Sequence, residues 1–447
     1  MQLSRRDLLT GAALALARGP TSQTHDFRAL APTPPMGWNS WDSFGPTITE
    51  AAARANAAIM ARELLPHGYN TFTIDIQWYE PGANSYHYRS GAALTMDQWG
   101  RLIPAASRFP SAARGAGFRP LAAYLHGLGL KFGLHMLRGV PRQAAAADTP
   151  IKGTPYRGAG IADRVNVCPW NSDMYGIDMS RPGAQRYYDS VLELYAAWGV
   201  DFIKADDMSR PYARNAPEIH ALRRAIDRSG RAMILSLSPG ATPLDCADDV
   251  TRTANLWRIS DDFWDTWPAL LEQFERLSNW SRYRRPGAWP DADMLPLGVL
   301  ELGKRTTRFT PDEQRTLLTL WSIAQSPLIM GGDLRALDAA TRALLTNDEV
   351  LAVNQKSRNA RQIARSASHA VWCAEATDGS GHYVALFNLT ATATATALVT
   401  VPLADLGLHR AVQVRDLWER VERGRAETSL SAPLRPHASG LFRLRPA

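Results

Sequence analysis

The amino-acid sequence predicts an α/β protein, a (β/α)8 TIM barrel followed by a C-terminal antiparallel β-sandwich. Short apolar runs that end in polar residues recur eight times between residues 36 and 334, with helical stretches between them. This alternation is typical of a barrel of parallel strands. After residue 356 the runs become short, alternating and punctuated by Gly, Pro and Asp, which indicates antiparallel strands. The length of 447 residues also favours two domains.

Eight runs have the length and apolar content of buried strands. They are Met36–Trp41, Tyr69–Trp78, Lys131–Leu137, Asp201–Asp207, Ala232–Ser238, Leu256–Asp262, Ala288–Leu295 and Ser326–Leu334. Helical spacing of apolar residues is clearest in Ala184–Trp198 and Pro311–Ala324. A doubly wound sheet is the main alternative, but the sequence lacks the Gly-rich phosphate-binding turn expected after its first strand.

The barrel is predicted to occupy residues 34–355, with residues 18–33 leading into it. Its last helix falls in Asn347–Gln355, and residues 356–447 are predicted to form the sandwich. Five runs of the second domain have the character of strands: 369–376, 382–390, 394–403, 411–419 and 440–446.

The N-terminus has the pattern of an export signal. Residues 4–9 (SRRDLL) resemble a twin-arginine motif, a short apolar stretch follows, and residues 15–17 (ALA) supply a small-residue cleavage site. Residues 1–17 are therefore predicted to be a signal peptide, and the protein is expected to be periplasmic or secreted. A frayed N-terminal helix is the alternative, because pairs of arginines are common in an arginine-rich chain.

Composition excludes several classes of protein. Hydrophobic residues make up 45% and charged residues 21%, which fits a globular protein, and no apolar run is long enough to span a bilayer. The three cysteines, Cys168, Cys246 and Cys373, are too few for a disulfide scaffold or a thiolate metal site. The net charge of +7 comes from arginines scattered among acids. We therefore expect neither membrane insertion nor a nucleic-acid partner.

Polar residues gather at the ends of the predicted strands, where barrel enzymes build their active sites. These strand ends carry Trp41, Asp75, Trp78, His135, Lys204, Asp206, Asp207, Ser236, Ser238, Arg258, Asp261, Asp262, Asp291 and Asp293. The carboxylates suit glycoside hydrolysis, chemistry on an oxygen-bound metal, or carbanion chemistry on a metal. Because no His-x-His motif lies on an early strand and no coenzyme motif is present, glycoside hydrolysis without metal or cofactor is favoured.

Six segments resemble, in order, the sequence signatures of glycoside hydrolase family 27, which contains α-galactosidases, α-N-acetylgalactosaminidases and β-L-arabinopyranosidases. They are 34–41 (PPMGWNSW), 74–78 (IDIQW), 198–206 (WGVDFIKAD), 289–295 (WPDADML), 326–334 (SPLIMGGDL) and 347–355 (NDEVLAVNQ). The resemblance covers most of residues 34–355. It implies a retaining exo-glycosidase whose substrate is an oligo- or polysaccharide with a terminal galactose-configured sugar.

The resemblance also implies roles for individual residues. Asp206 matches the nucleophile of the family, and Asp262 matches the acid/base, which needs less polar surroundings than the nucleophile. Asp261 and Asp265 are alternative candidates for the acid. The residues implied to bind the sugar are Trp41, Asp75, Ile76, His135, Lys204, Ser238, Arg258 and Asp293. Asp293 could equally cap a loop, and His135 could equally be a structural strand-end residue.

Three positions depart from the family pattern. Where galactosidases have two successive aspartates, this chain has Asp75 and Ile76, and a 6-hydroxyl facing Ile76 would lose a partner at a cost of ~1–3 kcal/mol. A pentopyranose lacks that hydroxyl, so β-L-arabinopyranosides compete evenly with α-D-galactosides unless Ile76 points into the core. Ser238 leaves room where galactosidases often have Glu. Met208 replaces a frequent cysteine, so the disulfide often found beside the nucleophile is expected to be absent.

Three alternatives remain open from the sequence. The room near Ser238 permits an α-N-acetylgalactosaminidase, since a larger pocket admits a substituent without requiring it. A non-catalytic sugar-binding protein on the same fold would lack one of the two carboxylates. A metal-dependent hydrolase would lose its activity on chelation.

Overall fold

Eight parallel strands form the barrel, and each lies within one of the eight predicted runs. In the computed structural model, which describes residues 26–390 and 396–447, they follow the order β10-β9-β8-β7-β3-β2-β1-β13. A parallel bridge between Leu295 and Met330 closes the sheet into a barrel. The strands are β1 (Met36–Asn39), β2 (Thr71–Ile74), β3 (Lys131–Leu137), β7 (Phe202–Asp206), β8 (Ile234–Leu237), β9 (Leu256–Arg258), β10 (Trp289–Asp291) and β13 (Leu328–Met330).

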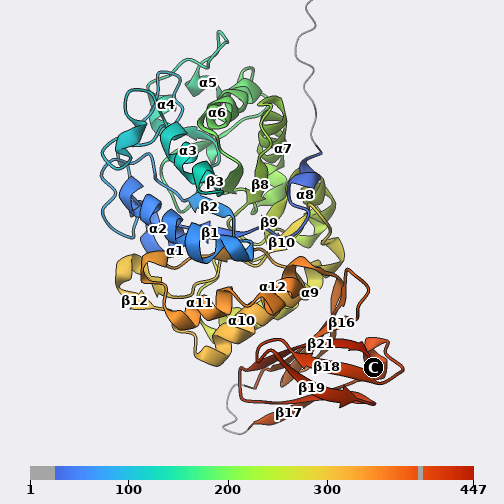
Figure 1. Ribbon diagram of the computed structural model, residues 1–447. Helices are drawn as coiled ribbons and strands as arrows, with labels where there is room; N and C mark the ends of the chain where they lie inside the picture. The colour runs from blue at the N-terminus through green and yellow to red at the C-terminus, as the bar shows by residue number, and fades with distance from the viewer. Residues whose placement is uncertain (1–25, 391–395) are drawn as a thin grey trace, which may run out of the picture.

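Helices surround these strands (Figure 1). Two of them have the bounds predicted from the sequence, α6 (Ala184–Trp198) and α10 (Pro311–Ala324). The others are α1 (Trp41–Phe44), α2 (Glu50–Glu63), α3 (Arg119–Gly127), α7 (Tyr212–Arg228), α8 (Ala247–Thr253), α9 (Trp267–Trp280), α11 (Ala339–Leu345) and α12 (Asp348–Gln355).

Local sequence explains where α10 begins and where α6 ends. Thr310 caps α10, accepting a hydrogen bond from the backbone N–H of Glu313, whose side chain accepts one from the backbone N–H of Thr310. This reciprocal arrangement satisfies two donors that a helix start leaves free. At the end of α6, Gly199 adopts a left-handed conformation with φ of 88°, which glycine reaches without steric cost.

A long excursion separates β3 from β7 at one end of the barrel. It contains α4 (Arg142–Ala146), α5 (Gly158–Ile161) and a small antiparallel sheet in the order β4-β6-β5. Its strands are β4 (Val140–Pro141), β5 (Ala162–Val167) and β6 (Met174–Ile177), and a second small hairpin is formed by β11 (Val299–Leu300) and β12 (Arg305–Thr306).

The C-terminal domain is an antiparallel sandwich. A six-stranded sheet in the order β14-β15-β16-β21-β18-β19 faces the two-stranded sheet β17-β20. The strands are β14 (Ser357–Arg365), β15 (His369–Ala376), β16 (His382–Asn388), β17 (Ala397–Pro402), β18 (Val412–Asp416), β19 (Val421–Ala426), β20 (Ser429–Leu434) and β21 (Ser439–Pro446). The predicted strand at 394–403 lies partly outside the described residues, and β14, β19 and β20 were not predicted.

The six-stranded sheet contributes to two hydrophobic cores, one on each of its faces, and its edge strand β19 is largely exposed. On β15, Trp372 belongs to the large core shared with the barrel, whereas its neighbours Val371 and Cys373 face the core between the two sheets. The alternation follows from the two-residue period of a strand. On the barrel side, Phe387 packs edge-on against Phe274 of α9, with ring centroids 4.8 Å apart.

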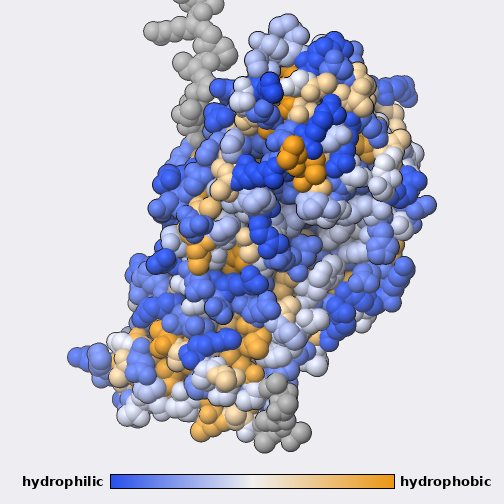
Figure 2. Space-filling model, turned by 180° about the vertical axis from the view of Figure 1, so that it is seen from behind, coloured by the Kyte–Doolittle hydropathy of each residue, from blue (hydrophilic) through white to orange (hydrophobic). Residues whose placement is uncertain are grey.

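Seen from behind, the surface is mostly hydrophilic, and hydrophobic residues show in small scattered groups, several of them over the sandwich at the bottom of the view (Figure 2). Within the described part of the chain, no helix is long and apolar enough to cross a membrane, and all three cysteines are free. The predicted signal peptide, residues 1–17, lies outside the described residues and remains a prediction.

Candidate active site

The carboxyl ends of the barrel strands surround a cavity of about 480 Å³. Of the ten residues predicted to be catalytic or to bind the sugar, all except Ile76, His135 and Ser238 lie on its wall. The residues lining the cavity are Trp41, Asp42, Asp75, Tyr88, Trp170, Lys204, Asp206, Pro239, Arg258, Asp261, Asp262, Phe263, Trp264, Asp293 and Met294. The wall therefore combines aromatic rings with six aspartates, a combination that suits a sugar-binding site.

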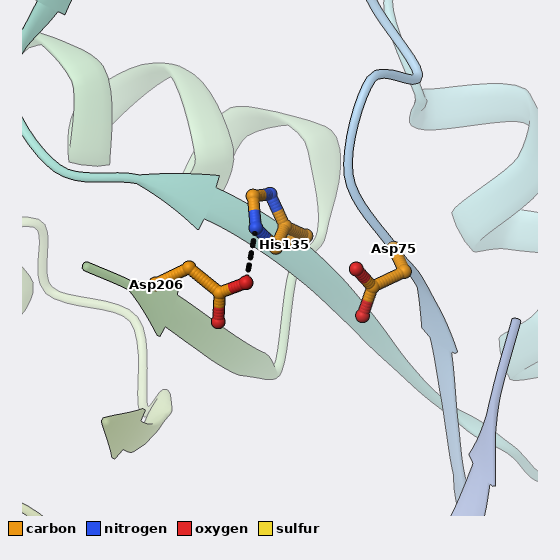
Figure 3. A group of neighbouring side chains, drawn as sticks. All are labelled: Asp75, His135 and Asp206. Carbon is orange, nitrogen blue, oxygen red and sulfur yellow. Dashed lines mark ion pairs between the residues drawn. The ribbon is translucent and has the colours of Figure 1, made fainter. Parts of the chain in front are cut away.

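Asp206 is the last residue of β7, and both oxygens of its carboxylate are engaged. Nε2 of His135, on the neighbouring strand β3, lies 2.9 Å from Oδ2, and the hydroxyl of Ser238 donates a hydrogen bond to Oδ1. Nζ of Lys204 lies 3.7 Å from Oδ2. Figure 3 shows the ion pair with His135, and it shows Asp75 on the other side of the same histidine. These contacts fix the direction in which the Asp206 carboxylate points.

The surroundings of Asp206 keep it ionised. Burial alone would raise its pKa, but the Lys204 ammonium, His135 and the Ser238 hydroxyl outweigh burial, and the net pKa lies well below the ordinary value. For Lys204, burial lowers the pKa, but Asp206 and Asp75 more than compensate and the net pKa is raised. An ionised carboxylate therefore sits beside a stable ammonium group at the end of β7.

Asp75 follows β2 and is completely buried. Its Oδ2 accepts hydrogen bonds from the side-chain amide of Asn39 at 2.7 Å and from Lys204 at 2.8 Å. Its Oδ1 accepts one from the backbone N–H of Ile76 at 2.7 Å. Three donors thus hold the Asp75 carboxylate at the cavity wall in one orientation.

A second charged group is centred on Arg258, the last residue of β9. Its Nη2 lies 2.8 Å from Oδ2 of Asp293 and 3.3 Å from Oδ1 of Asp262. Asp293 also accepts a hydrogen bond from the backbone N–H of Phe263 at 2.8 Å. Burial raises the pKa of Asp293 to about 6, with Arg258 opposing the increase and Asp262 adding to it. Asp293 therefore lines the cavity and also anchors the loop that carries Asp262.

The surroundings of Asp262 differ from those that the sequence predicted. Its side chain is 55% exposed and contacts the Arg258 guanidinium, so it lacks the less polar setting predicted for the acid. The reason is its position in a loop beyond the end of β9, which opens to solvent. The two alternative candidates for the acid form ion pairs with other residues. Asp261 is exposed and lies 2.6 Å from Arg210. Asp265 is buried off the cavity wall and lies 2.7 Å from Arg305.

Three residues that were predicted to bind the sugar lie behind the wall. Ile76 is 1% exposed and belongs to the barrel core. His135 and Ser238 are also buried, and both side chains contact Asp206. The structure thus places His135 and Ser238 as supports of the Asp206 carboxylate. Strand-end position alone did not distinguish the wall from the layer behind it.

Several wall residues were missed by the sequence analysis. The ring of Trp41 stacks on Tyr88 with centroids 5.5 Å apart, and Tyr88 lies 5.9 Å from Trp170. Tyr88 and Trp170 come from the long connections after β2 and between β5 and β6, so no strand-end signal marks them. By contrast, Trp38 and Trp78 are fully buried core residues.

One oxygen or nitrogen atom from each of Asp75, His135 and Asp206 lies within 4.8 Å of the others, a spacing compatible with a metal ion. The ammonium of Lys204 is already in contact with this cluster, 2.8 Å from Asp75 and 3.7 Å from Asp206. A divalent cation in the same place would be repelled by that ammonium group. The cluster therefore fits a protein cation better than a metal.

Comparison with known proteins agrees with this geometry. The family profile described as "Alpha galactosidase A" matches residues 171–356, and the "Alpha galactosidase C-terminal beta sandwich domain" matches residues 366–444. Alpha-galactosidase 2 of Arabidopsis thaliana is 29% identical, over 98% of this chain and 95% of its own. Alpha-N-acetylgalactosaminidase of Gallus gallus is 26% identical, over 76% of this chain and 75% of its own.

Among solved structures, a β-L-arabinopyranosidase of glycoside hydrolase family 27 from Geobacillus stearothermophilus is 49% identical. It superposes with a TM-score of 0.91, over 94% of this chain and 98% of its own. A relative of nearly the same extent thus superposes on the barrel and the sandwich together. The chain therefore belongs to glycoside hydrolase family 27 and is a glycosidase of the α-galactosidase type.

Proposed function

We propose that this glycosidase is a retaining exo-enzyme that removes terminal β-L-arabinopyranosyl residues in preference to α-D-galactosyl residues, with Asp206 as nucleophile and Asp262 as acid/base. The observation that carries the preference is the missing second carboxylate at position 76. Ile76 lies behind the cavity wall and does not itself face the sugar, so Asp75 is left as the single carboxylate where galactosidases have two, and a 6-hydroxyl finds no partner from this position. The 49% identity to a β-L-arabinopyranosidase supports it, as does the solved complex of a variant of that enzyme with arabinose.

In the first step, the Asp206 carboxylate attacks the anomeric carbon while Asp262 donates a proton to the glycosidic oxygen. The bond from the anomeric carbon to that oxygen breaks, the aglycone leaves as an alcohol, and a glycosyl ester of Asp206 forms. The lowered pKa of Asp206 keeps the nucleophile ionised for this attack. His135 and Ser238 hold its oxygens, so little reorganisation is needed.

In the second step, Asp262 accepts a proton from water, and the resulting hydroxide oxygen attacks the anomeric carbon of the ester. The sugar is released with its original configuration and Asp206 is regenerated. The 55% exposure of the Asp262 side chain suits this step, because water and protons reach it directly. A bound aglycone would cover Asp262 in the first step and supply the less polar setting that a proton donor needs.

Sugar binding is proposed to use the fixed polar groups around the cavity. Asp75 and Lys204 form a rigid pair, 2.8 Å apart, that offers acceptors and donors to ring hydroxyls. Arg258, anchored by Asp293, would donate hydrogen bonds to ring hydroxyls. The ring of Trp41, stacked on Tyr88, gives an apolar surface for one face of the sugar.

The preference for arabinoside is tested by the ratio of two kcat/KM values in one enzyme. We expect the wild type to hydrolyse p-nitrophenyl β-L-arabinopyranoside about 10- to 100-fold better than the α-D-galactopyranoside, since an unpartnered 6-hydroxyl costs ~1–3 kcal/mol. Ile76→Asp should move this ratio towards the galactoside. Because both rates come from the same preparation, loss of folded protein cancels in the ratio.

Ile76→Leu is the matched control, since it keeps the apolar core and should leave the ratio unchanged. A wild type that prefers the galactoside would refute the proposed preference while leaving the two-carboxylate mechanism intact. The N-acetyl-α-D-galactosaminide is measured alongside, because that activity occurs among the relatives. Faster turnover of this third substrate would point to the α-N-acetylgalactosaminidase alternative.

Chelation tests whether any metal takes part. Because Lys204 supplies the positive charge beside Asp75 and Asp206, we expect prolonged dialysis against EDTA to leave kcat/KM unchanged. Activity that is lost on dialysis and returns with a divalent cation would contradict this and revive the metal-dependent alternative.

A further inference from the structure

Asp42 is a carboxylic acid on the cavity wall to which neither the family motifs nor the mechanism above gives a role. It lies in α1, directly after Trp41, and is only 2% exposed. Its Oδ2 is shielded from solvent and has no hydrogen-bond partner among the described residues. A buried carboxyl oxygen without a partner costs free energy in the empty enzyme.

The packing around Asp42 shows that the protein keeps space for this group. Gly331, just beyond the end of β13, lies against the carboxyl, and a Cβ at this position would overlap Oδ2 of Asp42. Only a residue without a side chain leaves that space open. The carboxyl is thus accommodated on the wall without being satisfied there.

The charges around Asp42 are mostly negative. Burial raises its pKa well above the ordinary value, and Asp293, Asp262 and Asp75 add to the increase, while Lys204 opposes it. A carboxyl group in this setting takes up a proton more readily than an ordinary aspartate. In the protonated form it offers both a hydrogen-bond donor and an acceptor.

We propose that Asp42 is a further glycon-binding residue, whose carboxyl group hydrogen bonds a ring hydroxyl of the sugar in the cavity. Because Oδ2 is packed against Gly331 and shielded, the hydroxyl would meet the carboxyl at Oδ1, which is not among the shielded atoms without a partner in the described part of the chain. A hydroxyl is the matching ligand, because it can both donate to and accept from a neutral carboxyl group. This inference rests on the proposed function, since it takes the cavity as the place where the glycon binds.

The test compares Asp42→Ala, Asp42→Asn and wild type by kcat/KM on the arabinopyranoside and by melting temperature with and without L-arabinose. Asp42→Ala should lose about 10- to 100-fold in kcat/KM. Without sugar, it should melt no lower than wild type, because an unpartnered buried carboxyl has been removed. The increase in melting temperature caused by arabinose should be smaller than in wild type. Asp42→Asn, which keeps a donor and an acceptor, should retain most of the activity.

The outcomes separate a binding role from a structural one. If both variants keep wild-type kcat/KM and the full arabinose shift, Asp42 does not bind the glycon. If Asp42→Ala melts lower without sugar but its arabinose shift is undiminished, its role is structural and the inference is overturned. A wild type inactive on all the glycosides would refute the proposed function instead. The increases in melting temperature that L-arabinose and D-galactose cause in the three proteins would still test whether Asp42 binds the sugar.

Discussion

Replacing Asp206 by asparagine is expected to lower kcat on p-nitrophenyl β-L-arabinopyranoside by about 10⁴-fold or more, the scale on which covalent catalysts lose rate without their nucleophile. Asparagine has the same shape but cannot form the glycosyl ester. The hydrogen bond from Ser238 and the Lys204–Asp75 pair remain available. The variant should therefore fold, and its arabinose-induced increase in melting temperature should persist.

A chemical rescue makes this expectation specific to a nucleophile. In Asp206→Ala the carboxylate is gone and its space is open, so azide can attack the anomeric carbon from the same side. The bond to the aglycone breaks, and the product is a glycosyl azide of inverted configuration. Saturable azide rescue with that product would identify Asp206 as the nucleophile. Rescue that yields only free sugar of retained configuration would assign the role to another carboxylate.

The matched control lies at the opposite end of the same strand. Asp201 immediately precedes β7 and binds the ring of His126, with Nε2 and Oδ2 2.7 Å apart. Polar groups at that end of a barrel strand typically serve stability and not catalysis. Asp201→Asn should lower the melting temperature while leaving kcat within a few-fold of wild type. A loss of kcat comparable to that of Asp206→Asn would mean that the effect comes from a disturbed β7.

The barrel could be predicted because each strand carries its own signal. A strand that is buried on both faces is a continuous apolar run, and a polar residue ends it at the mouth. For that reason Asp75, Lys204, Asp206 and Arg258 were found at strand ends and lie together on the cavity wall. The same logic fails for Ile76 and His135, which are near strand ends but are buried behind the wall.

What the sequence did not reveal depends on contacts between distant segments. Tyr88 and Trp170 reach the cavity from long connections, and only the folded chain brings them to Trp41. In the sandwich, β19 (Val421–Ala426) is almost entirely exposed and lies at the edge of its sheet. Its strand conformation is set by hydrogen bonds to β18, and such an edge strand needs no alternating apolar pattern.

The second large effect is expected at Arg138, in the segment directly after β3. This guanidinium is 2% exposed, and it lies 2.6 Å from Oδ2 of Asp207 and 2.6 Å from Oε1 of Glu218. Its Nε also donates to the backbone carbonyl of Asp207 at 2.9 Å. Asp207 has a positive φ of 62° directly after the proposed nucleophile. Arg138 thus links the ends of β3 and β7.

Arg138→Met should lower the free energy of unfolding by about 3–5 kcal/mol, because Asp207 and Glu218 would remain buried without their cation. The measurement is denaturant unfolding of the variant and wild type. Arg181→Met is the control, since Arg181 pairs with Asp178 at 3.0 Å on the surface and both side chains are well exposed. Breaking such an exposed pair should cost about 0–1 kcal/mol. Equal losses of unfolding free energy in the two variants would show that burial does not make the Arg138 ion pairs more stabilising than a surface pair.

The dependence on pH identifies the cause of the loss. Burial raises the pKa of Glu218 and of Asp207, and Arg138 opposes both increases. Without Arg138 the two pKa values rise further, so the folded variant binds more protons than the unfolded chain above the ordinary carboxyl pKa. Its stability deficit should therefore shrink as the pH falls from 7.5 towards 5 and grow as the pH rises. Adding Glu218→Gln should recover part of the loss at pH 7.5, because a neutral amide replaces a buried unpaired charge. A deficit that is independent of pH and is not relieved by Glu218→Gln would mean that lost packing, and not unpaired charge, destabilises the variant.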